Sequence, residues 1–216
     1  MQTSGKTVIL ANGTFPESER TLAALEHAER IVACDGAAIP LMACGIMPDA
    51  VIGDLDSISA DLRKRLADRI VHVSEQDTND LSKAFRFCIS NGWKNIVILG
   101  ATGKREDHAL GNISLLADFT EQAPDTSILT DEGEFIAIHG TTSIKCKPGQ
   151  QVSIFALDAD THIYSTNLKY PLNGLAPTRW WQATLNETLD DEFTLEFPAS
   201  HAVLVFLANA VGSMRE

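Results

Sequence analysis

The first part of the chain alternates short apolar runs with segments of helical periodicity. The runs are mostly aliphatic, which is typical of strands buried on both faces of a sheet. The segments between them place apolar residues three and four positions apart, as on one face of a helix. This alternation indicates a mostly parallel sheet with flanking helices. We predict strands at 7–12, 30–35, 50–54, 70–74, 95–100 and 126–131. We predict helices around 22–28 and over 59–68, 78–92 and 107–119.

The pattern changes after Thr126. Strand-like runs now follow one another without a convincing helix, and several alternate apolar and polar residues, as half-buried antiparallel strands do. Turn residues such as "KPGQ" and "PLNG" separate them. We predict an α/β domain over 1–126, followed by an all-β, sandwich-like domain over 127–216. The predicted strands are 134–140, 142–146, 151–158, 161–168, 192–197 and 201–209.

Composition narrows the class of protein. Hydrophobic residues make up 44% and charged residues 21%, as in a globular protein with a real core. The sequence has no apolar run long enough for a membrane span, and its start does not read as a signal peptide. The four cysteines are scattered and form no CxxC pair, which disfavours a disulfide framework or a zinc site. We therefore expect a cytoplasmic protein.

The formal net charge is −12. This charge disfavours binding to nucleic acid or to an anionic membrane, because both need a basic surface. It leaves a nucleotide substrate possible, since carboxylates bind Mg²⁺ and the metal then neutralises phosphate.

Acidic residues follow the predicted strands of the first domain. They are Asp35, Asp54, Asp56, Asp77 and Asp80. The carboxyl ends of parallel strands meet at one edge of a sheet, where ligands bind in open α/β folds. Crowded carboxylates repel one another unless a hard cation neutralises them. The pattern predicts a metal–nucleotide site in which the carboxylates of Asp54, Asp56 and Asp80 hold Mg²⁺.

Each acidic motif also has a purely structural interpretation. The "GDLDS" segment fits an Asx-turn in which Ser57 or Ser59 caps the next helix. Thr78, Asn79 and Asp80 are residues that commonly start a helix. A DxD motif alone is therefore weak evidence of function.

The "GATGKREDH" segment follows the fifth predicted strand and opens a helix. Gly100 and Gly103 would expose backbone N–H groups to phosphate, and Lys104 and Arg105 would add positive charge. The spacing is not that of a Walker A loop. Asp107 also suits a helix N-terminus for its charge alone. His108 fits a structural hydrogen bond better than a general base.

Aromatic residues mark two segments of the second domain. Tyr170 lies beside a lysine, and Trp180 and Trp181 are adjacent. Aromatic faces attract flat heteroaromatic cations. In a strand, the two tryptophans would point to opposite faces, one of them into the core.

Together these motifs resemble the thiamine pyrophosphokinase family, in the family's order and over nearly the whole chain. The similarity rests on "DG" at 35–36, "GDLDS" at 53–57, D-x-x-D at 77–80 and "GATGKREDH" at 100–108, followed by Asn112, then on "NLKYPL" at 167–172 and "LNE" at 185–187. This chain departs from the family at three positions. It has Asn79 where Thr is common, Asn167 where Gly is common and Leu185 where Ser is common.

The resemblance implies transfer of pyrophosphate from ATP to the thiamine hydroxyl, giving thiamine diphosphate and AMP. It also implies a homodimer, with an N-terminal ATP domain, a C-terminal thiamine domain and thiamine near the interface. The implied catalytic residues are Asp54, Asp56, Asp80 and Arg105. The implied ATP-binding residues are Asp35, Gly36, Asp77, Gly100, Thr102, Gly103, Asp107, His108 and Asn112. The implied thiamine-binding residues are Tyr170, Trp180, Trp181 and Asn186.

Some alternatives stay open. The general base is unassigned among Asp77, Asp107 and a hydroxyl whose pKa the metal lowers. "GDLDSI" imitates the DxDx[TV] motif of haloacid-dehalogenase-like phosphatases, although Ile58 stands where that motif has Thr or Val. A nucleotide or thiamine sensor without turnover is a second alternative.

Overall fold

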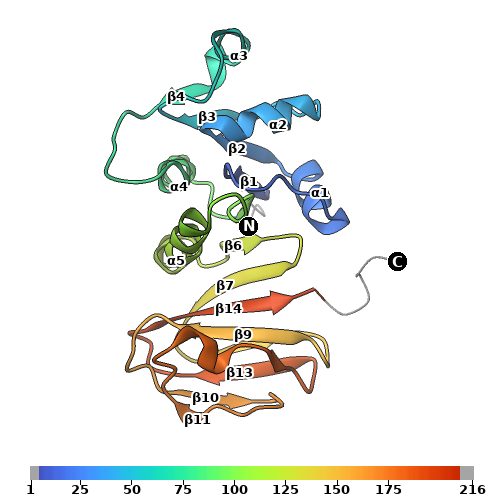
Figure 1. Cartoon of the computed structure of the whole chain (residues 1–216), viewed down its shortest axis with the longest axis vertical. Coiled ribbons are helices and arrows are strands. Elements are labelled where there is room, and N and C mark those ends of the chain that lie inside the picture. Colours follow the sequence, from blue (N-terminus) through green and yellow to red (C-terminus); the bar gives the residue numbers. More distant parts are fainter. Residues whose placement is uncertain (1–4, 210–216) are drawn as a thin grey trace. The chain divides into compact units, whose positions relative to one another are not determined.

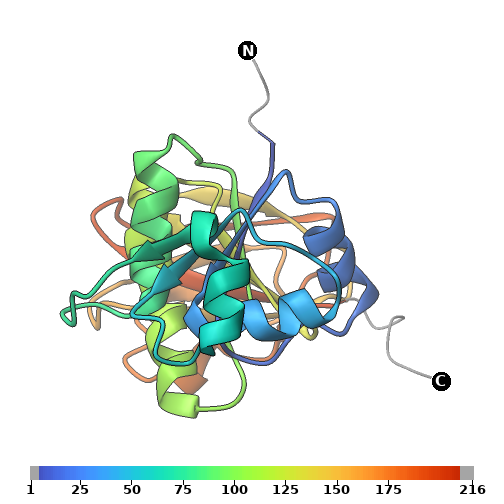
Figure 2. The same ribbon diagram turned by 90° about the horizontal axis from the view of Figure 1, so that it is seen from above.

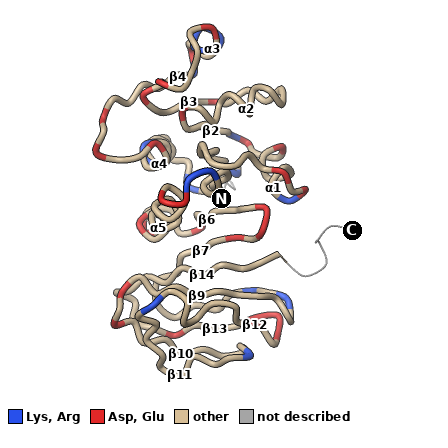
Figure 3. Tube along the Cα trace, viewed as in Figure 1, with Lys and Arg blue, Asp and Glu red and all other residues tan. Residues whose placement is uncertain are grey.

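The computed structural model describes residues 5–209 of the chain. The chain forms two compact units, unit 1 up to Asp131 and unit 2 from Glu132 (Figure 1). The strand-like run at 126–131 lies in unit 1, whereas the boundary predicted from sequence assigned residues from 127 onward to the second domain. Figure 3 shows that acidic segments occur in both units.

Unit 1 is built on a parallel sheet of strand order β6-β5-β1-β2-β3-β4. The sheet is parallel throughout, so the loops that follow its strands emerge at one edge. The central strands are almost wholly buried, as their continuous apolar runs predict. The bounds are β1 Thr7–Leu10, β2 Arg30–Cys34, β3 Ala50–Gly53, β4 Ile70–His72, β5 Ile96–Leu99 and β6 Ser127–Leu129.

Helices cover both faces of this sheet. On one face, Leu25 of α1 and Leu41 of α2 join a core with Val8 and Val51 of the sheet. On the other face, α4 packs against β1, β2 and β3 and contacts α5. Figure 2 shows the blue α1 and the green helices on opposite sides of the sheet. The bounds are α1 Glu19–Glu26, α2 Ala38–Ala43, α3 Ala60–Arg65, α4 Asp80–Ser90 and α5 Glu106–Gln122.

Unit 2 contains two antiparallel sheets, of order β12-β9-β14-β7 and β11-β10-β13-β8. The two sheets share one core, in which Ile154 and Val205 of the first lie with Ile144 and Phe193 of the second. This unit agrees with the predicted all-β domain. The bounds are β7 Gly133–His139, β8 Thr142–Lys145, β9 Gln151–Ala156, β10 Ile163–Thr166, β11 Asn173–Leu175, β12 Asn186–Glu187, β13 Glu192–Glu196 and β14 Ala202–Ala208.

The position predicted for the tryptophan pair was wrong. Trp180 and Trp181 begin the 3₁₀ turn η3 (Trp180–Ala183) and do not lie on a strand. Their side chains are both exposed, at 49% and 71%, so the prediction that one enters the core is wrong. The rings of Trp180 and Phe155 pack in a T-shaped arrangement, with ring centroids 6.1 Å apart.

No helix within residues 5–209 is both long enough and apolar enough to cross a membrane.

Candidate active site

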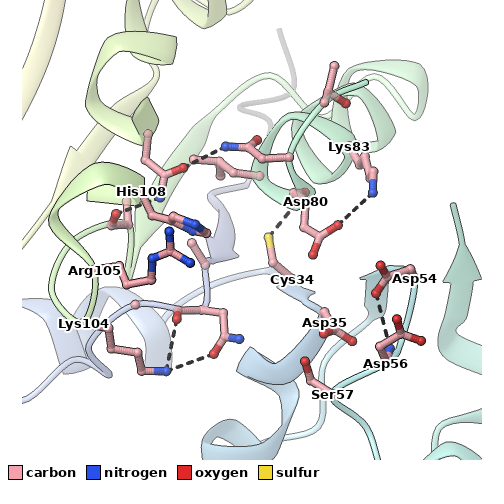
Figure 4. Close-up of a pocket in the computed structure, with 18 of the residues that line it drawn as sticks. Cys34, Asp35, Asp54, Asp56, Ser57, Asp80, Lys83, Lys104, Arg105 and His108 are labelled. Carbon is pink, nitrogen blue, oxygen red and sulfur yellow. Dashed lines mark hydrogen bonds and ion pairs between the residues drawn. The ribbon is translucent and has the colours of Figure 1, made fainter. Parts of the chain in front are cut away.

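A pocket of about 560 Å³ opens at the carboxyl edge of the unit 1 sheet. This volume is typical of a small-molecule site. The pocket is formed by the loops after β1, β2, β3, β4 and β5, by the first turn of α4 and by the first two turns of α5. Figure 4 shows acidic side chains on one side of it and Lys104, Arg105 and His108 on the other.

Most of the predicted ATP-site residues line this pocket, and some do not. Those that line it are Asp35, Asp54, Asp56, Asp80, Gly103, Arg105, His108 and Asn112. The predicted residues outside the lining are Gly36, Asp77, Gly100, Thr102 and Asp107.

The acidic side is assembled around Gly53, the last residue of β3. A Cβ at this position would lie 2.9 Å from Cβ of Asp35 and 3.4 Å from Oδ2 of Asp80. A side chain at position 53 would have to displace Asp35 and would then lie in contact with Asp80. Glycine therefore allows the ends of β2 and α4 to bring their carboxylates close to β3.

The loop after β3 has the structural role that its sequence suggested, and it also places Asp54 and Asp56 in the pocket lining. Oδ1 of Asp54 accepts a hydrogen bond from the backbone N–H of Asp56 at 3.3 Å, which lowers the pKa of Asp54. The intervening Leu55 has φ 69°. Ser59, one of two predicted caps, accepts a hydrogen bond from the N–H of Leu62 at the start of α3. The Asx-turn directs both carboxylates to the pocket, so the structural and functional interpretations are compatible.

Asp80 has a buried cationic partner that the sequence analysis did not consider. Nζ of Lys83, one turn further along α4, lies 3.0 Å from Oδ1 of Asp80. The Lys83 side chain is only 3% exposed and lines the pocket. A buried ammonium group needs such a partner, because leaving water is costly for a charge.

The predicted metal ligands Asp54, Asp56 and Asp80 share the pocket but do not form a ready-made ligand group. Within residues 5–209, no group of three or more His, Cys, Asp or Glu side chains is arranged to hold a metal ion. The donor chemistry nevertheless fits a hard cation. In the described part of the chain, the buried Oδ1 of Asp35 has no hydrogen-bond partner. An unpaired buried carboxylate oxygen is stabilised by a cation.

The basic side belongs to the loop between β5 and α5. Nε and Nη2 of Arg105 donate to the two carboxylate oxygens of Asp107, at 3.0 and 2.5 Å. This pairing lowers the pKa of Asp107 to about 2 and raises the pKa of Arg105. Lys104 donates to the backbone and side-chain oxygens of Asn12, at 3.1 and 3.0 Å. The guanidinium group therefore already has an anionic partner beside the pocket.

Two predicted residues of this loop have a structural role. The carbonyl oxygens of Gly100 and Thr102 accept hydrogen bonds from the N–H groups of Gly13 and Thr14, at 2.7 and 2.8 Å. These bonds join the loop after β5 to the loop after β1. Gly100 cannot be replaced by a larger residue without a shift, because a Cβ at this position would lie 2.6 Å from the carbonyl oxygen of Ala11.

Sequence reasoning missed several residues that line the pocket. Asn12 and Gln76 lie in loops, and Lys83 lies on α4 beside Asp80. The spacing of Asp80 and Lys83 was an available signal, since residues three positions apart share a helix face. Asn12 carried no such signal, because it reaches the pocket only through the pairing of β1 with β5.

In unit 2, the predicted thiamine residues differ in their freedom to bind. Tyr170 is 61% exposed, and Nζ of Lys169 lies 6.0 Å from the centre of its ring. Asn186 is buried, and its amide group is already in use. Its Oδ1 accepts from the N–H of Tyr170 at 3.1 Å, and its Nδ2 donates to the Tyr170 carbonyl at 2.7 Å. Asn186 therefore fixes the backbone of Tyr170.

Both units match models of one protein family. Residues 22–129 match "Thiamin pyrophosphokinase, catalytic domain", and residues 133–206 match "Thiamin pyrophosphokinase, substrate-binding domain". Thiamine pyrophosphokinase of Bacillus subtilis (strain 168) is 33% identical over 153 residues, which are 66% of this chain and 70% of that protein. Thiamin pyrophosphokinase 1 of Caenorhabditis elegans is 27% identical over 140 residues, 60% of this chain and 57% of that protein.

Solved structures share the fold. The crystal structure of thiamine pyrophosphokinase from Bacillus subtilis has a TM-score of 0.76 at 23% identity, over 95% of this chain and 100% of that chain. The Candida albicans thiamin pyrophosphokinase has a TM-score of 0.77 at 19% identity, over 94% and 89% of the two chains. The two family models together cover most of the described residues of both units. This chain therefore belongs to the thiamine pyrophosphokinase family.

Proposed function

We propose that this chain transfers the pyrophosphoryl group of ATP to the hydroxyl group of thiamine, giving thiamine diphosphate and AMP. The observation that carries the proposal is the divided pocket of unit 1. Its carboxylates lie on one side, with Lys83 beside Asp80, and Lys104, Arg105 and His108 lie on the other (Figure 4). The matches to family models for a catalytic and a substrate-binding domain support it. They do not favour a haloacid-dehalogenase-like phosphatase or a sensor without turnover.

The acidic side of the pocket is the proposed magnesium site. Asp54, Asp56 and Asp80 would hold Mg²⁺, and Asp35 joins them because its Oδ1 is buried without a partner. When bound, the ion supplies positive charge to the phosphate oxygens. Lys83 holds the Asp80 carboxylate in place through its 3.0 Å ion pair.

The basic side of the pocket is the proposed phosphate-binding side. Arg105 and the backbone of Gly103 would contact phosphate, with His108 and Asn112 nearby. The thiamine hydroxyl attacks the β-phosphorus, and the bond from that phosphorus to the oxygen of AMP breaks. Positioning and charge stabilisation dominate such transfers, so no covalent enzyme intermediate is needed. Asp77 and Asp107 stand outside the pocket lining, and we assign no general base.

Thiamine is proposed to bind through exposed aromatic side chains of unit 2. Tyr170 is the first choice for stacking on the thiamine rings, since its side chain is exposed and Asn186 fixes its backbone. Trp180 and Trp181 are the alternatives. We also propose a homodimer with thiamine near the interface, on the basis of the family resemblance. A cytoplasmic location is proposed from cysteine usage.

The decisive experiment supplies the purified chain with ATP, Mg²⁺ and thiamine and quantifies all products. We expect AMP and thiamine diphosphate in equal amounts. Asp54→Asn is expected to lower the turnover rate by about two orders of magnitude or more, because it removes a metal ligand. Asp61→Asn, at an exposed position in the first turn of α3, is the matched control and should keep full activity.

Other products would identify the alternatives. ADP in place of AMP would indicate an ordinary kinase. A trapped aspartyl phosphate at Asp54 would indicate the phosphatase, and binding without any product would indicate the sensor.

A further inference from the structure

We propose that Asn79 and Asn112 form a latch between the two loops that face each other across the pocket, and that this latch sets the affinity for ATP. Nδ2 of Asn79 donates to Oδ1 of Asn112 at 3.0 Å, and Nδ2 of Asn112 donates to the carbonyl of Ala101 at 2.8 Å. Both asparagines line the pocket. The proposal rests on the proposed ATP site.

The direction of this hydrogen-bond chain is fixed at both ends. Asn79 caps α4, and its Oδ1 accepts from the backbone N–H of Ser82 at 2.9 Å. Its Nδ2 is therefore the atom that faces Asn112. At the far end, the carbonyl of Ala101 can only accept, so Asn112 must present its Nδ2 there. Each amide is satisfied in one orientation only, which makes the latch a directed link between two backbone sites.

The latch connects the two loops that carry the chemistry. Asn79 is the last residue of the loop before α4, directly before Asp80 on the acidic side of the pocket. Ala101 begins the loop of Gly103 and Arg105, on the proposed phosphate side. Asn79 and Asn112 are 33 positions apart in the sequence. An ATP molecule held between metal ligands and Arg105 needs a fixed separation of these two sides.

Asn79 stands where the resemblance described above would lead us to expect Thr. A threonine hydroxyl can cap the helix, but it is bonded directly to Cβ and carries a single oxygen. It cannot accept from the N–H of Ser82 with one atom and donate to Oδ1 of Asn112 with another, as the asparagine amide does. Asparagine therefore adds to the helix cap a link that threonine does not make.

The variant Asn79→Thr separates the two roles, because it keeps the cap and removes the link. We expect it to weaken equilibrium binding of Mg²⁺–ATP by about three- to tenfold, the usual range for one hydrogen bond. Thiamine binding should change less than about twofold, and the melting midpoint should be preserved. Asn112→Ala should weaken ATP binding as well. In the Asn112→Ala background, Asn79→Thr should have no further effect, because the link is already broken.

Asn91→Thr is the matched control. Asn91 closes the other end of α4, where its Nδ2 donates to the carbonyl of Phe87 at 2.8 Å. This variant also loses one amide hydrogen bond, and it should leave ATP affinity unchanged. Additive effects of Asn79→Thr and Asn112→Ala on ATP affinity would overturn the latch, and so would equal losses of ATP and thiamine affinity.

Hydrogen exchange distinguishes failure of the latch from failure of the proposed function. In the protein without ligands, Asn79→Thr should speed amide exchange in both 75–80 and 101–105, whereas Asn91→Thr should not. Faster exchange in 75–80 alone would overturn the latch. If the wild-type chain binds no ATP while exchange in the two loops is coupled, the ATP site is wrong and the link between the loops stands.

Discussion

Backbone conformation suits one of the single-residue departures from the family pattern and not another. Asn167 and Leu185 both have φ 56°, in the left-handed region. Asparagine occupies this region with little strain, so it is a reasonable replacement for the Gly that is common at position 167. Leucine is not suited to it, and Leu185 is 73% exposed, so its side chain gains little from burial. Position 185 is therefore a strained site on the surface of unit 2.

We predict that Leu185→Asn stabilises the chain. Relief of the left-handed strain is expected to contribute about 1 kcal/mol to the free energy of unfolding. The N–H of residue 185 keeps its hydrogen bond to Oγ of Ser153, at 3.1 Å. Chemical denaturation measures the change. Leu189→Asn makes the same substitution at an exposed leucine whose φ is negative, and an equal gain there would refute the explanation.

The Arg105–Asp107 pair predicts a pH dependence. The folded pKa of Asp107 is lowered to about 2, so the stabilisation from this pair is present above the usual carboxyl pKa of about 4. It is lost as the pH falls from there towards 2. We expect an NMR titration of the Asp107 carboxyl group to give a pKa of about 2. Arg105→Gln should return it towards 4, and Arg65→Gln, on α3, should not.

At the scale of elements, periodicity predicted the strands of unit 1 well, because short continuous apolar runs seldom form anything other than buried strands. It missed α2, a short helix that contains Pro40. Proline is unfavourable inside a helix, yet Pro40 lies in the first turn, where its missing N–H costs nothing. The prediction of a strand around Trp180 was wrong for another reason. A hydrogen-bonded cap, in which Gln182 accepts from the N–H of Arg179 at 2.8 Å, closes a 3₁₀ turn that has no hydrophobic period.

Helix α4 carries the third prediction, which concerns the ion pair between Asp80 and the buried Lys83. Lys83→Met should lower the free energy of unfolding by about 2 kcal/mol, because it leaves the Asp80 carboxylate without its partner. The double variant Asp80→Asn with Lys83→Met should recover stability to within about 1 kcal/mol of wild type, since neither charge remains. Urea denaturation tests both values.

In the double variant, stability should recover but activity should not. The double variant is expected to stay inactive, because the proposed metal ligand Asp80 is gone. Recovered activity would show that Asp80 has only a structural role. Lys64→Met, at an exposed lysine of α3, serves as the control for lysine removal and should change stability by less than about 0.5 kcal/mol.

At the scale of the whole molecule, the sequence located most of the acidic side of the pocket, because carboxylates at strand ends can be read in chain order. It could not show which loop residues turn inward. Asp77 and Asp80 belong to one motif, but only Asp80 enters the pocket, where α4 begins. Asn186 appeared to be a ligand, and its contacts with Tyr170 are visible only in three dimensions. Side-chain direction depends on backbone geometry that a motif does not encode.

Binding of Mg²⁺–ATP should raise the melting temperature of the chain. At an ATP concentration about a hundred times the dissociation constant, binding adds about 2.7 kcal/mol to stability, or roughly 5–10 °C. Removal of Mg²⁺ with a chelator should abolish most of the rise, because the crowded carboxylates of Asp35, Asp54 and Asp80 repel bare phosphate. Differential scanning fluorimetry measures both conditions. An equal rise with and without the metal would contradict the magnesium site.

The hydrogen bonds between the loops after β1 and β5 have a consequence for synthesis on the ribosome. Lys104 and Asn12, which touch across these loops, are 92 positions apart in the sequence. The early part of a nascent chain therefore leaves the exit tunnel long before its partner has been translated, and β1 waits unpaired on its β5 side until then. Translation speed through the segment before β5 thus governs how long an apolar strand edge stays exposed to chaperones and to neighbouring chains.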